Sequence, residues 1–597
     1  MPHTIDYTLT PIRPEAHLFE VTCTVADPDP AGQRFALPAW IPGSYMIREF
    51  AKNIVSLRAE AGGRPLAIDK LDKHTWCAAP TREAITVSYR VYAWDLSVRT
   101  AHLDQTHGFV NGTSVFLRVL GREDRPHRVE LRRPEGLPAY AGWRVATTLP
   151  EARGVKGAAK RYGFGLYQAA DYDTLVDHPI EMGSFTLARF EACGVPHEVA
   201  ITGRHDCDVE RLCADLKKIC EWQIRLFGEP APMERYLFLV MAVGDGYGGL
   251  EHRASTALIC SRDDLPHAGM QAMSEGYRGF LGLCSHEYFH TWNVKRIKPA
   301  AFVPYDLSQE NYTRLLWAFE GFTSYYDDLC LVRSGVIGVD DYLKLLAKTC
   351  TQVRRGPGRL VQSVAESSFD AWIKYYRQDE NTPNAVVSYY TKGALIALGL
   401  DLLLRAESGG KKCLDDVMRL LWQRHGQTGV GVAEEGVFAA VAEVGGDKPA
   451  RWLKKAVAEA AELPLERLLQ PFAVRLAWEA PKDAAAGYRP ALGLRTASEG
   501  SELKVAQVFD GGPAQSAGLS AGDVLVAVDG LKAGPNLDKV LARKTTGDAL
   551  WVVAFRRDEL MEFRLTLQAP PQDNAALTPA ERPSAAARAL RKGWLGR

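Results

Sequence analysis

Residues 284–292 read Cys284-Ser285-His286-Glu287-Tyr288-Phe289-His290-Thr291-Trp292, a His-Glu-x-x-His pattern inside an apolar run. Residues four apart lie on one face of a helix, so His286 and His290 would present their imidazoles to a single ion, with Glu287 beside them. Two imidazoles and an adjacent carboxylate in this order are typical of a catalytic Zn²⁺ with its general base. The alternative is a buried helix whose two histidines are ordinary core groups.

A catalytic zinc needs a third protein ligand, and two downstream glutamates are candidates. Glu310 lies twenty residues after His290, the spacing of thermolysin-type sites, whereas Glu320 lies thirty residues after it. Glu320 falls inside an apolar, helix-like run, a rigid element that can aim a carboxylate at another helix. Glu310 falls where that helix would begin, and an acidic residue there is explained by favourable helix capping. The pattern therefore favours Glu320 over Glu310.

The composition is that of an ordinary globular protein with several domains. A chain of 597 residues is too long for one core, and its 72 basic and 72 acidic residues lack the basic excess expected of a nucleic-acid or anionic-membrane partner. We see no secretory signal and no apolar run long enough for a membrane span. The eleven cysteines are scattered, with no C-x-x-C pair, which favours reduced thiols and a cytoplasmic location. The oligomeric state is not indicated.

The order of patterns predicts a multidomain α+β chain. Alternating stretches at 19–25, 84–91 and 114–119 predict a β-rich N-terminal domain over 1–175. Residues 176–470 predict a thermolysin-like catalytic domain, an α/β lobe followed by an α-helical lobe. A proline- and alanine-containing stretch at 481–490 precedes the last globular unit, which we place within 478–569. Residues 570–597 are rich in Ala, Pro and Arg and are predicted to form a loosely held C-terminal tail.

The last globular unit resembles a PDZ domain. The run Gly512-Pro513-Ala514-Gln515-Ser516-Ala517-Gly518-Leu519, followed by Gly522-Asp523-Val524-Leu525, carries the resemblance. It implies that the loop Leu492-Gly493-Leu494 cradles a terminal carboxylate with its backbone N–H groups. A C-terminal peptide would then bind by adding a strand to the sheet.

Longer motifs resemble the glycyl aminopeptidase family of gluzincin metallopeptidases. They are His286-Glu287-Tyr288-Phe289-His290-Thr291-Trp292-Asn293-Val294-Lys295-Arg296-Ile297, Phe319-Glu320-Gly321-Phe322-Thr323 and Trp40-Ile41-Pro42-Gly43-Ser44-Tyr45. The resemblance implies a β-rich N-terminal domain, a thermolysin-like catalytic domain and a C-terminal PDZ domain. It also implies one Zn²⁺ on His286, His290 and Glu320, with Glu287 as general base. Ser324 stands where thermolysin has an Asp that supports a histidine, so the partner that orients the zinc ligands is unassigned.

Two further elements are assigned by the same resemblance. Gly248-Gly249-Leu250-Glu251-His252 is similar to the G-x-M-E-N element of aminopeptidases, which implies that Gly248, Gly249 and Glu251 bind substrate. Glu251 would pair with the free α-ammonium group, and His252 replaces the Asn. Tyr390, in Tyr390-Thr391-Lys392-Gly393, resembles the tyrosine whose hydroxyl stabilises the oxyanion, with Tyr389 as its rival.

Three functions remain open at this stage. The first is a zinc aminopeptidase acting on peptides with a free N-terminus, with Gly or Ala as the residue that the family name implies. The second is a zinc endopeptidase with the same fold. The third is a catalytically inactive, PDZ-containing binding protein; because His286, Glu287, His290 and Glu320 are all present, the sequence favours an enzyme.

Overall fold

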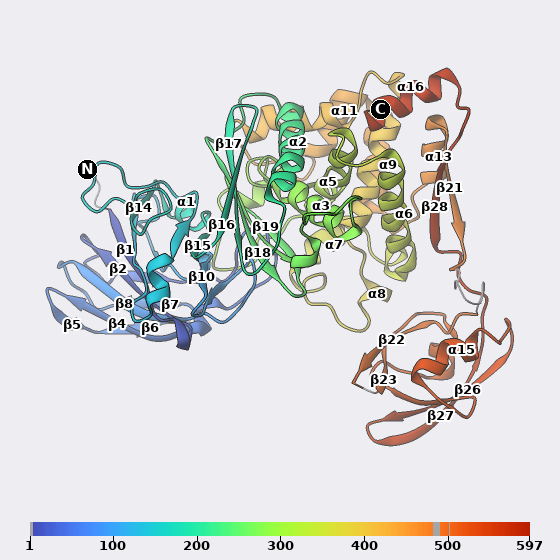
Figure 1. Ribbon diagram of the computed structural model, residues 1–597, viewed down its shortest axis with the longest axis horizontal. Helices are drawn as coiled ribbons and strands as arrows, with labels where there is room; N and C mark the ends of the chain where they lie inside the picture. Colours follow the sequence, from blue (N-terminus) through green and yellow to red (C-terminus); the bar gives the residue numbers. More distant parts are fainter. Residues whose placement is uncertain (1–3, 482–489, 501, 597) are drawn as a thin grey trace. The chain divides into compact units, whose positions relative to one another are not determined.

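The computed structural model describes residues 4–481, 490–500 and 502–596 (Figure 1). The chain forms two compact units. Unit 1 comprises Met1–Asn311, Ser334–Val336 and Leu421–Val432, and unit 2 comprises Tyr312–Arg333, Ile337–Leu420 and Ala433–Arg597. Most of the predicted stretch at 481–490 lies outside the described residues. Within the described part, no helix has both the length and the apolar character needed to cross a membrane.

Unit 1 begins with β-sheets whose strands alternate buried and less buried side chains, as one-sided burial requires. The largest is a seven-stranded sheet. In spatial order its strands are β14 (Gly165–Ala169), β12 (His127–Leu131), β1 (Ile5–Arg13), β2 (Leu18–Val25), β8 (Ile85–Tyr92), β4 (Ile54–Ala61) and β5 (Arg64–Leu66). A four-stranded sheet contains β13 (Arg144–Ala146), β15 (Ile180–Gly183), β10 (His107–Val110) and β9 (Ala101–Leu103). Another contains β11 (Arg118–Val119), β3 (Arg34–Ala36), β7 (Thr75–Ala78) and β6 (Ile68–Lys70).

The strand predicted over 114–119 is mostly wrong, because only Arg118–Val119 forms a strand. The preceding segment is buried without a ladder, and three tyrosine hydroxyls satisfy its carbonyl groups. Tyr89 donates to the carbonyl of Val115, Tyr172 to that of Phe116 and Tyr7 to that of Leu117, at 2.8, 2.6 and 2.7 Å. Side chains thus replace the hydrogen bonds that a neighbouring strand would supply.

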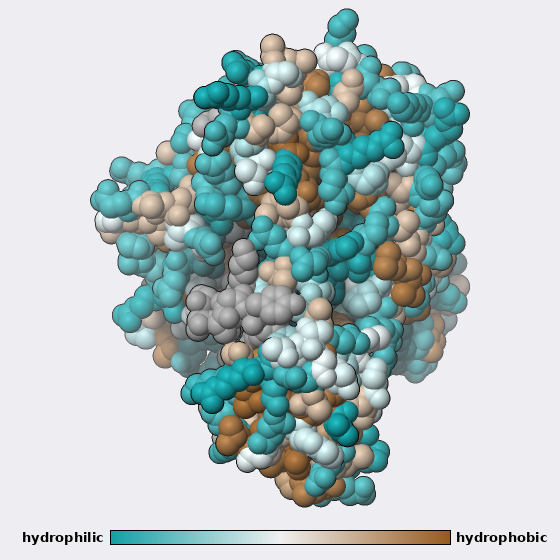
Figure 2. All heavy atoms as spheres, turned by 90° about the vertical axis from the view of Figure 1, so that its right-hand side faces the viewer, coloured by the Kyte–Doolittle hydropathy of each residue, from teal (hydrophilic) through white to brown (hydrophobic). Residues whose placement is uncertain are grey.

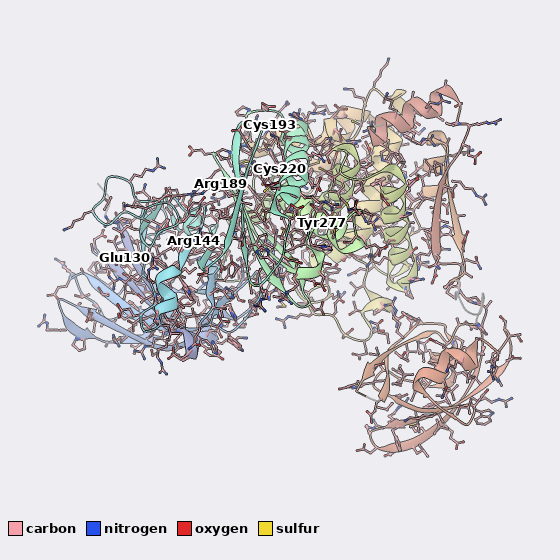
Figure 3. The ribbon with its side chains drawn as sticks, viewed as in Figure 1. Glu130, Arg144, Arg189, Cys193, Cys220 and Tyr277 are labelled. Carbon is pink, nitrogen blue, oxygen red and sulfur yellow. The ribbon has the colours of Figure 1, made fainter. Side chains whose placement is uncertain are left out.

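The second part of unit 1 is an α/β layer (Figure 1). Its sheet has the order β16 (Thr186–Ala192), β17 (Val195–Thr202), β18 (Tyr236–Val243), β20 (Ser255–Ser261) and β19 (Tyr247–Glu251). Strands β17, β18 and β20 are parallel, and β19 is antiparallel at the edge. Its helices are α2 (Val209–Phe227) and α3 (Glu275–Phe289), whereas α1 (Tyr172–Val176) packs against β14 in the first part of the unit. Tyr277 of α3, labelled in Figure 3, donates to Asp215 of α2 at 3.0 Å and ties the two helices together.

Unit 2 is mainly helical. Its helices are α4 (Leu316–Phe319), α5 (Gly321–Arg333), α6 (Val339–Arg355), α7 (Val364–Phe369), α8 (Thr382–Ala385), α9 (Thr391–Ser408), α10 (Leu414–Leu421), α11 (Gly436–Gly445), α12 (Asp447–Ala458) and α13 (Leu465–Leu469). Helices α4 and α5 are separated at Glu320, and Gly446, with φ of 79°, separates α11 from α12.

A separate sheet forms the last globular part of unit 2, with its own apolar core. Its strands are β22 (Leu494–Glu499), β23 (Glu502–Val508), β24 (Val524–Val528), β26 (Ala549–Arg556) and β27 (Glu559–Thr566), with β25 (Leu531–Lys532) beside β24. Two short helices, α14 (Pro513–Ala517) and α15 (Leu537–Leu541), accompany it. The face drawn in Figure 2 is mostly hydrophilic, with scattered apolar side chains.

The prediction of a loosely held tail over 570–597 is wrong. Strand β28 (Asn574–Pro579) pairs with β21 (Val474–Glu479), and α16 (Ala585–Leu595) packs within unit 2. Trp594 is fully buried, and its indole N–H donates to the Tyr325 hydroxyl at 3.1 Å. The alanine-rich composition concealed an amphipathic helix anchored by one tryptophan.

The predicted multidomain α+β class is confirmed. All eleven cysteines are free thiols, including Cys193 and Cys220, which Figure 3 labels.

Candidate active site

Helix α3 carries the His-Glu-x-x-His pattern at its C-terminal end. Ser274 caps its start by accepting from the Tyr277 N–H at 3.0 Å, and His290 is its C-cap residue. Glu287 and His290 are 5% and 2% exposed, so both polar groups are buried. A buried carboxylate needs a positive charge or hydrogen-bond donors beside it, and a buried imidazole needs hydrogen-bond partners or a metal ion.

The two imidazoles are arranged as ligands of one cation. Their Nε2 atoms lie 3.0 Å apart, with the ring planes at 83°. His290 Nδ1 lies 2.7 Å from the carbonyl oxygen of Asn293, and a proton on Nδ1 leaves the lone pair on Nε2. Facing nitrogens at this distance fit a shared cation. The carbonyl of Asn293 is also the orienting partner that the sequence left unassigned.

The turn after α3 holds that carbonyl in place. Val294 has a φ of 134°, an unusual conformation for a β-branched residue, and the Lys295 N–H donates to the His290 carbonyl at 3.0 Å. Lys295 Nζ lies 2.6 Å from Asp177, and both side chains are buried. Burial alone would raise the pKa of Asp177, but Lys295 and Arg253 hold it well below its usual range. The ion pair therefore anchors the strained turn that orients His290.

Strand β19 approaches Glu287 as closely as a glycine permits. A Cβ atom at Gly249 would lie 2.1 Å from Glu287 Oε1, whereas one at Gly248 would instead meet Ile259 and Arg99. Of the two glycines predicted to bind substrate, Gly249 is thus the one that lies against α3. Because β19 ends the sheet order, its outer edge can receive an extended peptide.

Glu251 lies at the end of β19, beside Glu287 and His290. Ligand-capable atoms of these three side chains all lie within 4.8 Å of one another. Glu251 is 4% exposed, and its Oε1 has no hydrogen-bond partner among the described residues. Two buried carboxylates this close favour a bound cationic group.

The Trp40–Tyr45 loop supports Glu251 from another side. Gly43 has a φ of 94°, and a Cβ there would lie 2.5 Å from Glu251 Oε2. Trp40 is fully buried and donates from its indole to the Asp306 carbonyl at 2.8 Å. The loop is therefore tightly packed and also contacts the candidate substrate-binding carboxylate, so it combines the two roles that its aromatic and proline-rich sequence offers, a packed loop and the lining of a substrate cleft.

His252, which replaces the expected Asn, belongs to the Asp177 network. It is 2% exposed, and its Nδ1 lies 3.7 Å from Asp177 Oδ1. It therefore links the residue after Glu251 to the ion pair that anchors the turn after α3.

In unit 2, Glu320 and Tyr390 belong to one helix crossing. Helices α5 and α9 meet at two glycines: a Cβ at Gly321 would lie 2.6 Å from the Gly393 Cα. Glu320, immediately before Gly321, is 2% exposed. Burial raises the pKa of Tyr389, and the nearby Glu320 charge raises it further. The glycines of both motifs are thus explained by close packing of the helices that carry them.

Tyr390 is distinguished from Tyr389 by its surroundings. Tyr389 is fully buried, and its hydroxyl has no partner among the described residues. The Tyr390 hydroxyl lies 3.1 Å from that of Tyr376, and its side chain is less buried. The sequence did not identify Tyr376; its signal is a second Tyr-Tyr pair, Tyr375-Tyr376, upstream of Tyr389-Tyr390.

The predicted PDZ carboxylate loop, Leu492–Leu494, packs against the segment around Gly512. Gly493 has a φ of 72°, and a Cβ there would lie 2.8 Å from the Gly512 Cα. The carbonyl groups of Leu492 and Gly493 accept from Ala514 and Phe509, both at 2.9 Å. Leu494 begins β22, the strand beside which a peptide would add.

Comparison with known families identifies three matching regions. The M61 peptidase N-terminal domain matches residues 6–184, the M61 glycyl aminopeptidase domain matches 279–396, and a PDZ domain matches 490–567. The solved structure of an aminopeptidase N family protein from Idiomarina loihiensis is 44% identical, with a TM-score of 0.93 over 99% of this chain and 100% of that one. This chain belongs to the M61 glycyl aminopeptidase family.

The family prediction is confirmed, and the chain is a metallopeptidase with a C-terminal PDZ domain. An M1 zinc metallopeptidase from Deinococcus radiodurans is more distant, at 14% identity and a TM-score of 0.49 over 78% of this chain and 95% of that one. The structure of a mutant of that enzyme bound to a Tyr-Ser-Ala substrate is 16% identical to this chain, with a TM-score of 0.47. The match again covers 78% of this chain and 95% of that one. No curated protein is similar in sequence.

Proposed function

We propose that this protein is a zinc aminopeptidase that removes the N-terminal residue from peptides with a free amino group. The observation that carries the proposal is the placement of Glu251 beside Glu287 and His290. A carboxylate beside the candidate general base, at the end of the peptide-binding edge, would pair with the substrate α-ammonium. The reacting bond would then lie one residue from that ammonium.

The proposed zinc ligands are His286, His290 and Glu320, which offer one ligand atom each. The facing Nε2 atoms of the two histidines and a buried carboxylate are the donor set typical of a catalytic zinc. When bound there, Zn²⁺ supplies a Lewis acid that polarises the scissile carbonyl and acidifies a water molecule. Glu320 lies further along the chain from His290 than the third ligand of thermolysin-type sites does. The same ligand set is still proposed, because Glu320 stands on a separate helical segment, between α4 and α5.

The protein's own residues carry the proton transfers and the binding. Glu287 takes the proton of the attacking water and delivers it to the leaving amine. The Tyr390 hydroxyl donates a hydrogen bond to the developing oxyanion. Strand β19 aligns the peptide backbone along its edge, where Gly249 lets the chain lie close to Glu287.

The finer parts of the proposal follow from the sequence. The released residue is Gly or Ala, as the family name implies, and the eleven free thiols favour a reducing, cytoplasmic location. The Leu492-Gly493-Leu494 loop binds the C-terminal carboxylate of a peptide ligand.

The test compares Gly- and Ala-p-nitroanilide with their N-acetylated forms, with the zinc content of the protein measured in parallel. Turnover of the free amines alone supports the aminopeptidase. Turnover of blocked substrates would instead show an endopeptidase, and no turnover of either by the zinc-loaded protein would favour a binding role.

A matched pair of variants tests Tyr390. Tyr390→Phe is expected to lower kcat by about 10²- to 10³-fold, the usual effect of removing one oxyanion donor. Tyr389→Phe, the control, removes a buried hydroxyl that makes no hydrogen bond within the described part of the chain, and should change kcat by less than about threefold. Equal effects of the two substitutions would contradict the role of Tyr390.

A further inference from the structure

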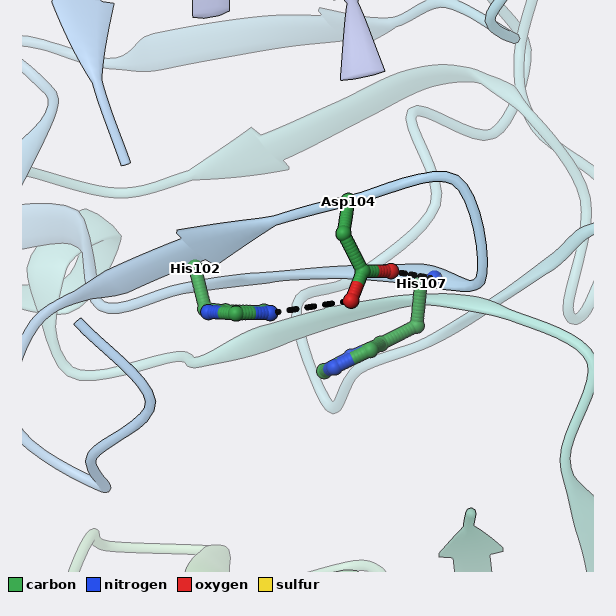
Figure 4. Close-up of side chains that lie close together, drawn as sticks. All are labelled: His102, Asp104 and His107. Atoms are coloured by element: carbon green, nitrogen blue, oxygen red, sulfur yellow. Dashed lines mark hydrogen bonds and ion pairs between the residues drawn. The ribbon is translucent and has the colours of Figure 1, made fainter. Parts of the chain in front are cut away.

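A second group of metal-capable side chains lies in the β9–β10 hairpin, on strands far in sequence from α3. His102 is on β9, His107 is on β10, and Asp104 begins the turn between them. Figure 4 shows the Asp104 carboxylate between the two imidazoles. His102 and His107 are 4% and 2% exposed, whereas the Asp104 side chain keeps 29% of its surface. The group is thus buried on two sides and open to solvent on the third.

Each carboxylate oxygen of Asp104 has a separate environment. Oδ1 accepts from the Thr106 N–H and hydroxyl, both at 2.6 Å, and from the His107 N–H at 3.1 Å. These bonds fix the turn and the direction of the carboxylate. Oδ2 lies 3.4 Å from His102 Nε2, which is long for a hydrogen bond. Two ligand atoms around a tetrahedral zinc, each bonded at about 2.1 Å, are separated by about 3.4 Å.

Glu181 orients His107 as a carboxylate orients a metal-bound histidine. Its Oε1 lies 3.1 Å from His107 Nδ1 and also accepts from the Thr202 hydroxyl at 3.1 Å. A proton on Nδ1 that bonds to Glu181 leaves the lone pair on Nε2. That atom is buried and has no hydrogen-bond partner in the described structure. A carboxylate behind a histidine whose other nitrogen is available is the usual support of a metal-bound imidazole.

The rings of His102 and His107 have nearly the separation of the pair on α3. Their centroids lie 4.9 Å apart, compared with 4.7 Å for His286 and His290, but their planes are inclined by 26°, whereas those on α3 are inclined by 83°. One ligand atom from each of His102, Asp104 and His107 lies within 4.8 Å of the others. Because the two rings are nearly parallel, one imidazole has to rotate about its side-chain bonds for both lone pairs to converge on one ion.

We propose that His102, Asp104 and His107 bind a zinc ion, distinct from the ion proposed on α3. Two imidazoles and one carboxylate are a common zinc ligand set, and the exposed side of Asp104 leaves a fourth position for water. The bound ion fixes the hairpin to Glu181 on β15. Through Thr202 it also fixes the hairpin to the end of β17 in the α/β sheet, so its role is to stabilise the junction of the two parts of unit 1.

The test counts the zinc bound by full-length protein that has been stripped of metal, reloaded with Zn²⁺ and freed of excess ion. The wild type should hold two zinc ions per chain. His107→Gln and Asp104→Asn should each hold one and keep aminopeptidase turnover, whereas His286→Ala should hold one and lose turnover. A single zinc in the wild type that disappears in His286→Ala would overturn the proposal. So would two zinc ions that persist in both hairpin variants.

A thermal measurement covers the case in which a hairpin variant folds poorly. In the His286→Ala background, Zn²⁺ should raise the melting temperature, because the ion binds only the folded hairpin. Adding Asp104→Asn should abolish the rise. A rise of equal size in both proteins would assign the stabilisation to another site and overturn the proposal.

Discussion

The two histidine pairs of unit 1 have similar ring separations on different backbones, but the ring planes meet at 83° on α3 and at 26° in the β9–β10 hairpin. On α3 the histidines are four residues apart on one helical face, and on the β9–β10 hairpin they are five apart on adjoining strands. A backbone carbonyl, that of Asn293, orients His290, whereas a side-chain carboxylate, that of Glu181, orients His107. The helical pair leaves a recognisable sequence pattern, and the hairpin pair does not. The hairpin pair should also be the more sensitive to substitution of its orienting residue.

The largest expected effect is a loss of turnover that depends on the histidine pair of α3 and not on the pair of the hairpin. Glu287→Gln keeps the size of the side chain but removes the general base, so kcat should fall by about 10²- to 10⁴-fold. Zinc binding at both pairs should remain, since Glu287 is not a proposed ligand. Steady-state kinetics with Gly-p-nitroanilide and a zinc assay on the same preparation measure both. A variant that retains most of its turnover would remove Glu287 from the mechanism.

Glu251 should matter only for substrates with a free amino group. Glu251→Gln removes a charged partner of the α-ammonium, a hydrogen bond worth about 1.5–3 kcal/mol, so kcat/KM should fall by about 10- to 150-fold. Glu181→Gln, a buried carboxylate changed in the same way at the hairpin, is the matched control and should leave kcat/KM unchanged. Equal losses in both variants would indicate a general structural effect instead.

The hairpin pair should depend on the side chain that orients it. Glu181→Gln is expected to weaken zinc binding at the hairpin by about 10- to 100-fold, the usual cost of losing a carboxylate behind a metal-bound histidine. Competition with a chromophoric chelator in the His286→Ala background measures this affinity. Unchanged affinity would mean that Glu181 does not orient a zinc ligand.

The smallest effect should come from Thr202. Thr202→Val removes the hydroxyl that donates to Glu181 and should lower the free energy of unfolding by about 1 kcal/mol. The change should be visible in denaturant unfolding monitored by fluorescence. A stability equal to that of the wild type would show that the link from Glu181 to β17 contributes nothing measurable.

Local patterns made part of the structure predictable. The apolar periodicity and the i, i+4 histidines predicted a helix over the metal motif, and the glycine-rich run predicted the PDZ domain. The preference for Glu320 over Glu310, which stays a prediction, also came from local pattern, because one lies in an apolar helical run and the other does not. Glu310 belongs to no metal-capable group in the described residues.

Contacts between distant segments were not predictable in this way. The approach of Gly43 to Glu251 joins a loop to the end of strand β19, and the contact between the His102 and His107 rings depends on the hairpin register. The segment 115–117 was predicted as a strand because its residues are apolar. They are apolar because the segment is buried, and not because it pairs in a sheet. Its carbonyl partners are tyrosine hydroxyls from three distant places in the chain.

The two glycines against Glu251 and Glu287 limit how this enzyme can be re-engineered. Gly43 and Gly249 each leave less than the space of one methyl group beside Glu251 and Glu287. A side chain at either position would displace the carboxylate that it meets, so a change of substrate preference is better sought at other positions. For the same reason, resistance to an inhibitor that occupies this corner could not arise at Gly43 or Gly249 without moving Glu251 or Glu287.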